Sequence, residues 1–235
     1  MLGNSPPTLT KLPTKQPISP APVVHHVTVP APAHNRTKPS NPAGEDAKKV
    51  PTPEPAPVAV LKEIFAKSEG GRQALKRPLR CLFFKPSQDA IDAYNIRAVR
   101  AIREKNVPLL RTMLEEGISL DACNRFGESL LHMACRRGDV NVVRFLLLEG
   151  RVNINVRDDF GRSCLHDACW TAEPNFAVMD VLLEYSPASL LLSEDVRSHT
   201  PFHYARKEHW GAWVSYLKEK EPKITAMLNM FQAVG

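Results

Sequence analysis

Two short stretches of this 235-residue sequence combine histidine and cysteine at spacings suited to chemistry. His132 precedes Cys135 by three residues, and His166 stands between Cys164 and Cys169. Residues three apart share one face of a helix, and imidazole with thiolate is both a zinc ligand set and a nucleophile with its base. Neither HMAC nor HDAC supplies the orienting group and oxyanion site that a nucleophile needs. The sequence also has no P-loop, dinucleotide glycine pattern or H-E-x-x-H motif.

Both stretches belong to a pattern that recurs along the chain. The similar segments are NRFGESLLHMACRRGDVNVVRFLLLEG, DDFGRSCLHDACWTAEPNFAVMDVLLEY and DVRSHTPFHYARKEHWGAWVSYLKEK. Their histidines, His132, His166 and His203, are 34 and 37 residues apart. An upstream segment, NIRAVRAIREKNVPLLRTMLEEG, keeps the later half of the pattern without a histidine. The chain therefore holds four units, counted from this upstream one, and repetition favours packing over a single active centre.

Each unit is predicted to form two short antiparallel helices. The first helix starts near the Ser or Thr before the histidine, and the second carries apolar residues at helical spacing. In the second unit this stripe consists of Val142, Val143, Leu146 and Leu147. Gly138 should end the first helix and Asp139 should cap the second, while Asn106 and Pro108 do the same in the first unit. A helix pair this small buries its apolar face only by stacking on its neighbours.

The sequences SLLHMA, SCLHDA and TPFHYA resemble the T-P-L-H-x-A signature of ankyrin repeats, and the likeness covers residues 91–220. It implies an all-α solenoid of three to four repeats. The cysteine- and tryptophan-rich HDACW and KEHWGAW also resemble ankyrin proteins of diatoms. Only the third signature keeps its proline, and Ser198 stands where Gly127 and Gly161 stand in the earlier turns, so we expect a distorted last turn.

The resemblance assigns structural roles to the residues that first suggested chemistry. It implies that the histidines bond around the turn and to the next unit, and that Cys135 and Cys169 are small buried hydrophobes. Equivalent positions in successive repeats lie about 10 Å apart, too far for one zinc ion. We therefore expect no catalysis, metal or cofactor. The structural repeat residues are Gly127, His132, Ala134, Gly138, Gly161, His166, Ala168, Thr200, Pro201, His203 and Ala205.

The resemblance further implies a protein-binding concave face, made from turn fingers and the outward side of each first helix. On the helices this face should include Met133, Arg136, Arg137, Asp167, Trp170, Thr171, Tyr204, Lys207 and Glu208. The fingertips should contribute Arg125, Phe126, Asp159 and Phe160. Trp, Tyr and Arg most often dominate interface energies, so Trp170 is a candidate anchor, although we favour the alternative that it is a packed or cap-covered aromatic residue. We expect an unidentified protein partner and a monomeric chain.

The segments outside the repeats differ in composition. Residues 1–57 hold fourteen of the 21 prolines and are expected to be a disordered arm, either a spacer or a docked ligand. Lys+Arg minus Asp+Glu gives +3 for 1–60, +4 for 61–90 and −1 for 91–235, so we interpret 58–90 as a basic linker. This linker is expected to contain a short helix that ends at Gly70 and Gly71. This helix should pack upstream of the stack. Tethering of segment 61–90 to nucleic acid or a membrane is the alternative function, which we favour less.

The downstream end should be closed by a C-terminal capping helix over 222–235, following an ankyrin domain over 91–221. Ile224, Met227, Leu228 and Phe231 fall on one helical stripe, which would serve either as a cap or as a partner-binding helix. No apolar run of eighteen residues and no secretory signal occur, and the five scattered cysteines form no disulfide framework. We therefore expect a cytoplasmic or nuclear protein, with organelle import left open.

Overall fold

The computed structural model describes residues 55–76 and 86–230, which all lie within one compact unit, Val50–Gly235. The proline-rich arm up to residue 54, residues 77–85 of the basic linker and Phe231 of the C-terminal stripe lie outside the described residues. No strand occurs within the described ranges, and a single isolated bridge joins Cys123 to Ser129. The described chain is helical, as the sequence predicts.

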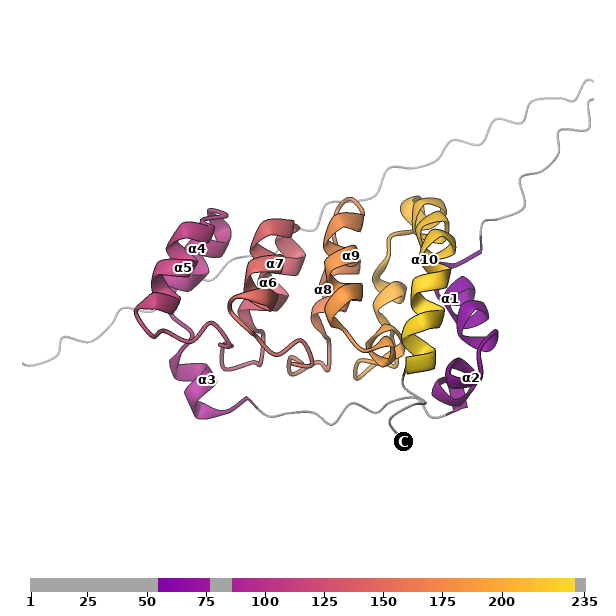
Figure 1. Ribbon diagram of the computed structural model, residues 1–235, viewed down its shortest axis with the longest axis horizontal. Coiled ribbons are helices and arrows are strands. Elements are labelled where there is room, and N and C mark those ends of the chain that lie inside the picture. The colour runs from indigo at the N-terminus through magenta and orange to yellow at the C-terminus, as the bar shows by residue number, and fades with distance from the viewer. Residues whose placement is uncertain (1–54, 77–85, 231–235) are drawn as a thin grey trace, which may run out of the picture. The chain divides into compact units, whose positions relative to one another are not determined.

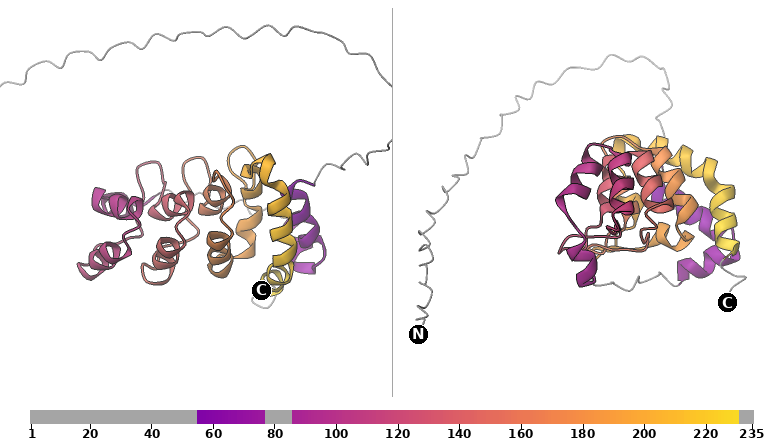
Figure 2. Two further views of the ribbon diagram at one scale, coloured as in Figure 1. Left: turned by 90° about the horizontal axis from the view of Figure 1, so that it is seen from above. Right: turned by 60° about the vertical axis from the view of Figure 1, so that its left-hand side comes forward.

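Three successive helix pairs lie side by side in the stack (Figures 1 and 2). The first helices are α4 (Ile96–Arg103), α6 (Leu130–Arg137) and α8 (Cys164–Cys169), and their partners are α5 (Val107–Glu115), α7 (Val140–Leu148) and α9 (Phe176–Tyr185). A fourth unit contains the short 3-10 helices η1 (Ala188–Leu192), η2 (Pro201–Tyr204) and η3 (Lys207–His209), followed by α10 (Trp210–Met230). Before the stack, α3 (Gln88–Asp92) leads into α4.

The helix ends follow the capping residues in the sequence. Gly138 adopts a left-handed conformation, with φ 71°, and ends α6, after which the Asp139 side chain accepts hydrogen bonds from two main-chain N–H groups of α7. Asn106 and Asn175 cap α5 and α9 in the same way. Asn175 also donates a 2.7 Å hydrogen bond from Nδ2 to the Gly138 carbonyl, which joins two neighbouring units. The caps therefore set both the helix boundaries and the contact between repeats.

Small buried side chains let neighbouring first helices approach closely. Ala134, Cys135, Ala168 and Cys169 are at most 2% exposed, and α6 packs directly on α8. On the other layer, α7 packs on α9 through a continuous apolar core. Burial of small residues between units explains why the signature alanine is followed by cysteine rather than by a larger residue.

The last turn keeps the geometry of the earlier turns. Ser198 has φ 60°, close to the 76° of Gly127 and the 75° of Gly161. The expected distortion is therefore wrong, because the Asp195 side chain accepts hydrogen bonds from the main chain on both sides of Ser198 and stabilises the loop. The last unit differs instead in its first helix, which is one 3-10 turn.

The end of the stack after the last repeat is covered by helices from both sides of the repeat region. The helices α1 (Pro57–Ala66) and α2 (Glu69–Lys76) pack on α10 (Figure 1), and Lys67 forms a 2.6 Å ion pair with Glu221 of α10. On α1, Leu61 and Phe65 are fully buried. The expectation that this segment packs upstream of the stack is wrong, since α1 covers the downstream end.

The boundaries of these terminal helices also differ from the sequence expectation. The first helix ends at Ala66, and Gly70 and Gly71 lie inside α2. A Cβ atom on Gly71 would collide with the Phe65 carbonyl, so glycine is needed where the two helices meet. At the other end, α10 runs through the expected boundary between 221 and 222 as one 21-residue helix, with Pro222 on its exposed side. No helix in the described part of the chain is long and apolar enough to cross a membrane.

Candidate partner-binding face

Three loops of the same construction precede the first helices of the second, third and fourth units, and we call them finger 1 (124–128), finger 2 (158–162) and finger 3 (195–199). In each, the first residue donates its main-chain N–H to the carbonyl of the fifth, at 3.0, 3.0 and 2.9 Å. The side chain of that first residue, Asn124, Asp158 or Asp195, also accepts two main-chain N–H groups within the finger. The fingers are therefore rigid turns held by their own polar atoms.

Main-chain hydrogen bonds connect each finger to the next. The Asp159 N–H of finger 2 donates to the Phe126 carbonyl of finger 1 at 2.8 Å, and the Val196 N–H of finger 3 donates to the Phe160 carbonyl at 2.9 Å. The fingers thus form a ladder in which equivalent side chains recur in register.

The signature histidines join this ladder to the helices. Nδ1 of His132 accepts the Ser129 N–H, so the ring proton lies on Nε2, which donates to the Arg162 carbonyl of finger 2 at 3.0 Å. Nδ1 of His166 likewise accepts the Ser163 N–H, and its Nε2 donates to the His199 carbonyl at 3.1 Å. Both rings use both nitrogens in hydrogen bonds, which leaves neither free to ligate a metal or act as a base.

Burial keeps the chemistry-bearing side chains of the signature neutral. It lowers the pKa of His132 and lowers that of His166 to about 4. The thiols of Cys135 and Cys169 are fully buried, and burial raises their pKa well above the ordinary value. A thiol is nucleophilic as the thiolate, so this environment suits packing.

Exposed aromatic side chains follow one another along the fingers and the first helices. Phe126, Phe160 and Trp170 are 50%, 55% and 47% exposed. The ring of Trp170 meets Tyr204 of the next unit edge-on, with centroids 6.1 Å apart. We call these four residues the aromatic row.

Arginines flank the aromatic row. The Arg125 guanidinium lies 4.7 Å from the Phe126 ring centroid, and that of Arg162 lies 5.2 Å from Phe160 and 5.8 Å from Trp170. In the last unit, Arg197 donates to the Tyr204 hydroxyl at 2.7 Å, and that hydroxyl donates to Asp195 at 2.6 Å. Sequence reasoning missed Arg162 and Arg197, although Arg162 directly follows Gly161 and so had to lie at the base of a finger.

Two residues expected on the exposed face are buried. Met133 is 8% exposed and Asp167 is 2% exposed, and the two hold equivalent places in successive units. The prediction that they present their side chains is wrong, because α6 and α8 pack too closely for this position to reach the surface. Burial raises the pKa of Asp167 to about 6, while the charges of Arg136 and Arg162 act to lower it. Within the described residues, Oδ1 of Asp167 has no hydrogen-bond partner.

The remaining expected residues lie around the aromatic row. Arg136 forms ion pairs with Glu128 and, at 3.7 Å, with Asp167. Arg137 is exposed, donates to the Arg103 carbonyl at 3.4 Å and pairs with no carboxylate in the described part of the chain. Asp159, Lys207 and Glu208 are exposed, while the Thr171 hydroxyl donates to the Glu173 carbonyl.

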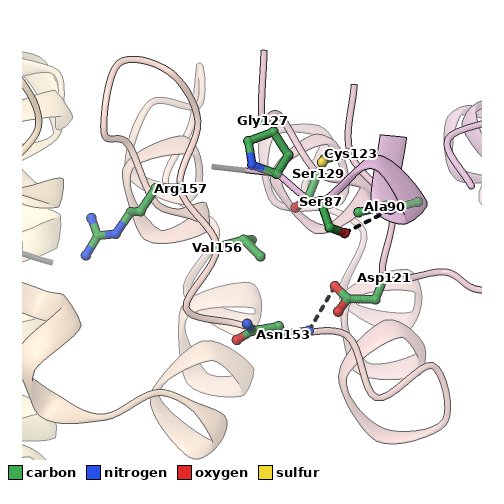
Figure 3. A pocket seen from close by; sticks show the side chains of 11 residues that line it. Ser87, Ala90, Asp121, Cys123, Gly127, Ser129, Asn153, Val156 and Arg157 are labelled. Atoms are coloured by element: carbon green, nitrogen blue, oxygen red, sulfur yellow. Dashed lines mark hydrogen bonds between the residues drawn. The ribbon is translucent and has the colours of Figure 1, made fainter. Parts of the chain in front are cut away.

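A cavity of about 220 Å³ lies between the bases of fingers 1 and 2 (Figure 3). Asp121 accepts the Asn153 N–H at 3.2 Å on one side, and Ser87 caps α3 on another. Burial and the Asp121 charge raise the pKa of Cys123, and the Arg157 side chain points away from the other labelled residues in Figure 3. This cavity lacks an activated nucleophile or an inward-facing cation.

Comparisons with known proteins found similarities over parts of the chain. A family model described as ankyrin repeats (3 copies) matches residues 98–190. A Caenorhabditis elegans protein, "Ankyrin repeat-containing protein F37A4.4", is 34% identical over 62 residues, which are 26% of this chain and 5% of that protein. The crystal structure of the ankyrin repeat domain of Bcl-3 aligns with a TM-score of 0.43 and 23% identity, over 54% of this chain and 57% of that one.

The helix pairs, the fingers and the family match define an ankyrin-repeat solenoid. The chain contains this domain, with the matched repeats over residues 98–190, and the predicted fold class is confirmed. The finer likeness to diatom proteins stays a prediction.

Proposed function

We propose that this protein is a non-catalytic scaffold whose protein partner binds the concave face formed by the fingers and the first helices. Ankyrin repeats are in general protein–protein interaction modules, and solenoids of this kind bind along an extended concave surface. The specific surface and its partner are our inference.

The observation that carries the proposal is the aromatic row. Three large apolar side chains are about half exposed: Phe126 in the second unit, and Phe160 and Trp170 in the third. Isolated exposed apolar residues are ordinary, but a contiguous set flanked by arginines has the composition of an interface centre. Arg137 adds a cation without a carboxylate partner among the described residues.

The charge around the row indicates how a partner is oriented. The carboxylates of Glu128, Asp158 and Asp195 already pair with arginines of the same face. Arg125 and Arg137 form no ion pair with a carboxylate among the described residues. We therefore infer that acidic side chains of the partner lie beside them, while its apolar side chains cover the aromatic row.

Tethering through the basic segment 61–90 receives less support. Residues 77–85 of that segment lie outside the described residues. In the described part, Lys67 pairs with Glu221 and Arg72 pairs with Glu69, so part of the positive charge is neutralised within the protein.

The proposal is tested by recovering partners of the full chain by proximity labelling and measuring their affinity for purified variants. We expect W170A to weaken binding by about tenfold or more, because removing a central aromatic hot-spot residue from an interface costs about 2–4 kcal/mol. L148A is the matched control, since Leu148 is 49% exposed but lies on α7, which is neither a finger nor a first helix. Equal affinities of W170A and the unmodified chain, or an equal loss in L148A, would contradict the proposal.

A further inference from the structure

Two groups at the last finger lack the hydrogen-bond partner, within the described residues, that their counterparts have at the earlier fingers. In fingers 1 and 2, the carbonyl of the third residue accepts an N–H from the next finger. The histidine that follows finger 1 or finger 2 donates to a carbonyl of the next finger. The counterparts after finger 3 are the Arg197 carbonyl and Nε2 of His203, and neither has a hydrogen-bond partner within the described ranges.

The His203 ring is nevertheless held in the orientation of its counterparts. Its Nδ1 accepts the Thr200 N–H at 2.9 Å and lies 2.9 Å from the Thr200 hydroxyl oxygen. The proton therefore lies on Nε2, and partial burial together with the charges of His199 and Lys62 lowers the ring's pKa. A donor is thus preset where a fourth finger would supply its carbonyl.

No described residue fills the space beside this donor. A cavity of about 340 Å³ lies between α1 and the last unit, lined by Ala59 and Lys62 on one side and by Phe202, His203 and Trp210 on the other. The ammonium group of Lys62 is exposed and forms no ion pair in the described part of the chain. Val196 of finger 3 is 57% exposed, which is more than either fingertip phenylalanine.

We propose that the edge of finger 3 and this cavity bind an acidic, turn-forming peptide segment of a partner protein in place of a fourth finger. A main-chain N–H of the peptide donates to the Arg197 carbonyl, and a peptide carbonyl accepts from Nε2 of His203. An acidic side chain pairs with Lys62, and an apolar one covers Val196. Main-chain pairing of this kind supplies affinity, while the side-chain contacts supply specificity.

The chain itself contains a suitable probe, because finger 2 already makes the equivalent bonds within the stack. A blocked peptide based on residues 156–163, with both arginines replaced by glutamine (VQDDFGQS), carries the N–H, the carbonyl and two acidic residues without a compensating cation. Titrated into the ¹⁵N-labelled full chain, it is expected to shift the amide signals of residues 196–203 and 56–62. Methylation of the peptide nitrogen that corresponds to Asp159 removes the donor and should weaken binding about fivefold.

Charge reversal on the protein provides a second test. We expect K62E to weaken binding of the same peptide about fivefold or more. K76E is the matched control, because Lys76 is exposed on α2, lies outside the cavity and has no ion pair in the described residues. The control should bind within about twofold of the unmodified chain.

Four outcomes would overturn the inference. These are no binding at millimolar peptide, equal binding of the methylated peptide, equal effects of K62E and K76E, and shifts confined to fingers 1 and 2. Sedimentation that reveals a dimer dissociated by the peptide would assign the edge to a second copy of the chain and would also overturn it. The W170A experiment probes a different surface, so failure here leaves the concave-face proposal standing.

Discussion

Two adjacent side chains in α8 have pKa values that are shifted in opposite directions, and their effects on stability fall in overlapping pH ranges. Burial lowers the pKa of His166 to about 4 from its usual 6.5, and raises that of Asp167 to about 6 from 3.8. Between pH 6.5 and 4 the unfolded chain binds more protons at His166, so this residue makes stability fall as the pH falls. Between pH 6 and 3.8 the folded chain binds more protons at Asp167, so this residue makes stability rise as the pH falls. The two contributions partly cancel.

Replacing Asp167 with asparagine should leave the effect of His166 on the pH dependence of stability without its opposing partner. D167N is expected to raise the free energy of unfolding at pH 7 by about 1–3 kcal/mol, because it removes a buried charge. Its stability should then decline more steeply than that of the unmodified chain between pH 6.5 and 4.5. Urea unfolding followed by circular dichroism at several pH values measures both effects. D159N, at an exposed fingertip, is the control, and parallel pH profiles for D167N and the unmodified chain would contradict the assignment.

Gly127 combines a left-handed conformation with a close neighbour. A Cβ atom there would lie 2.8 Å from the Arg157 carbonyl oxygen, whereas at Gly117, which has a similar φ of 79°, nothing lies within 4 Å. We expect G117A to cost about 1 kcal/mol of stability from backbone strain alone, and G127A to cost about 2–4 kcal/mol. Chemical denaturation of the two variants separates strain from collision. Equal losses would mean that finger 2 moves aside freely.

At the scale of elements, the sequence predicted the repeated parts well and the junctions poorly. The position of His132 and the caps at Gly138 and Asp139 located helices because capping and periodicity are local properties. Which end of the stack α1 covers is a non-local choice between two apolar end surfaces, and no local pattern distinguishes them. The exposure of Met133 was also unpredictable, because it depends on how closely α6 and α8 approach.

The packing of α1 on α10 predicts that the two fold as one unit. F65A should lower the free energy of unfolding by about 3–5 kcal/mol, because Phe65 is fully buried in this contact. E63A, which changes an exposed residue of the same helix, should change it by less than about 0.5 kcal/mol. Urea unfolding followed by tryptophan fluorescence, to which the buried Trp213 contributes, compares the two. If F65A were as stable as E63A, α1 would contribute nothing to the stack.

At the scale of the whole described domain, each unit contacts mainly its neighbours, so a local loss of stability should spread along the stack and weaken with distance. The layers α4–α6–α8 with η2 and α5–α7–α9 provide parallel routes for this coupling, and the second continues to α10 through Phe176 against Trp213. The finger ladder and the histidine bonds form a third connection between units.

Hydrogen exchange on F65A should therefore follow a gradient. Amides of α10 and η2 are expected to lose protection most, those of α8 less, and those of α4 least. Mass spectrometry of peptic fragments, compared between F65A and E63A, resolves this order. A uniform loss in all repeats would indicate a single cooperative unit instead of neighbour-by-neighbour coupling.

The placement of α1 has a consequence for synthesis of the chain on the ribosome. Its apolar side, including Leu61 and Phe65, is made long before α10, which begins at Trp210. At ordinary translation rates the intervening residues take about 10–30 s. During that interval the helix has no native surface to cover it, so the nascent chain carries an uncovered apolar segment that a chaperone can bind. Closure of the last repeat therefore waits until α10 has emerged from the ribosome, after the whole repeat region has been made.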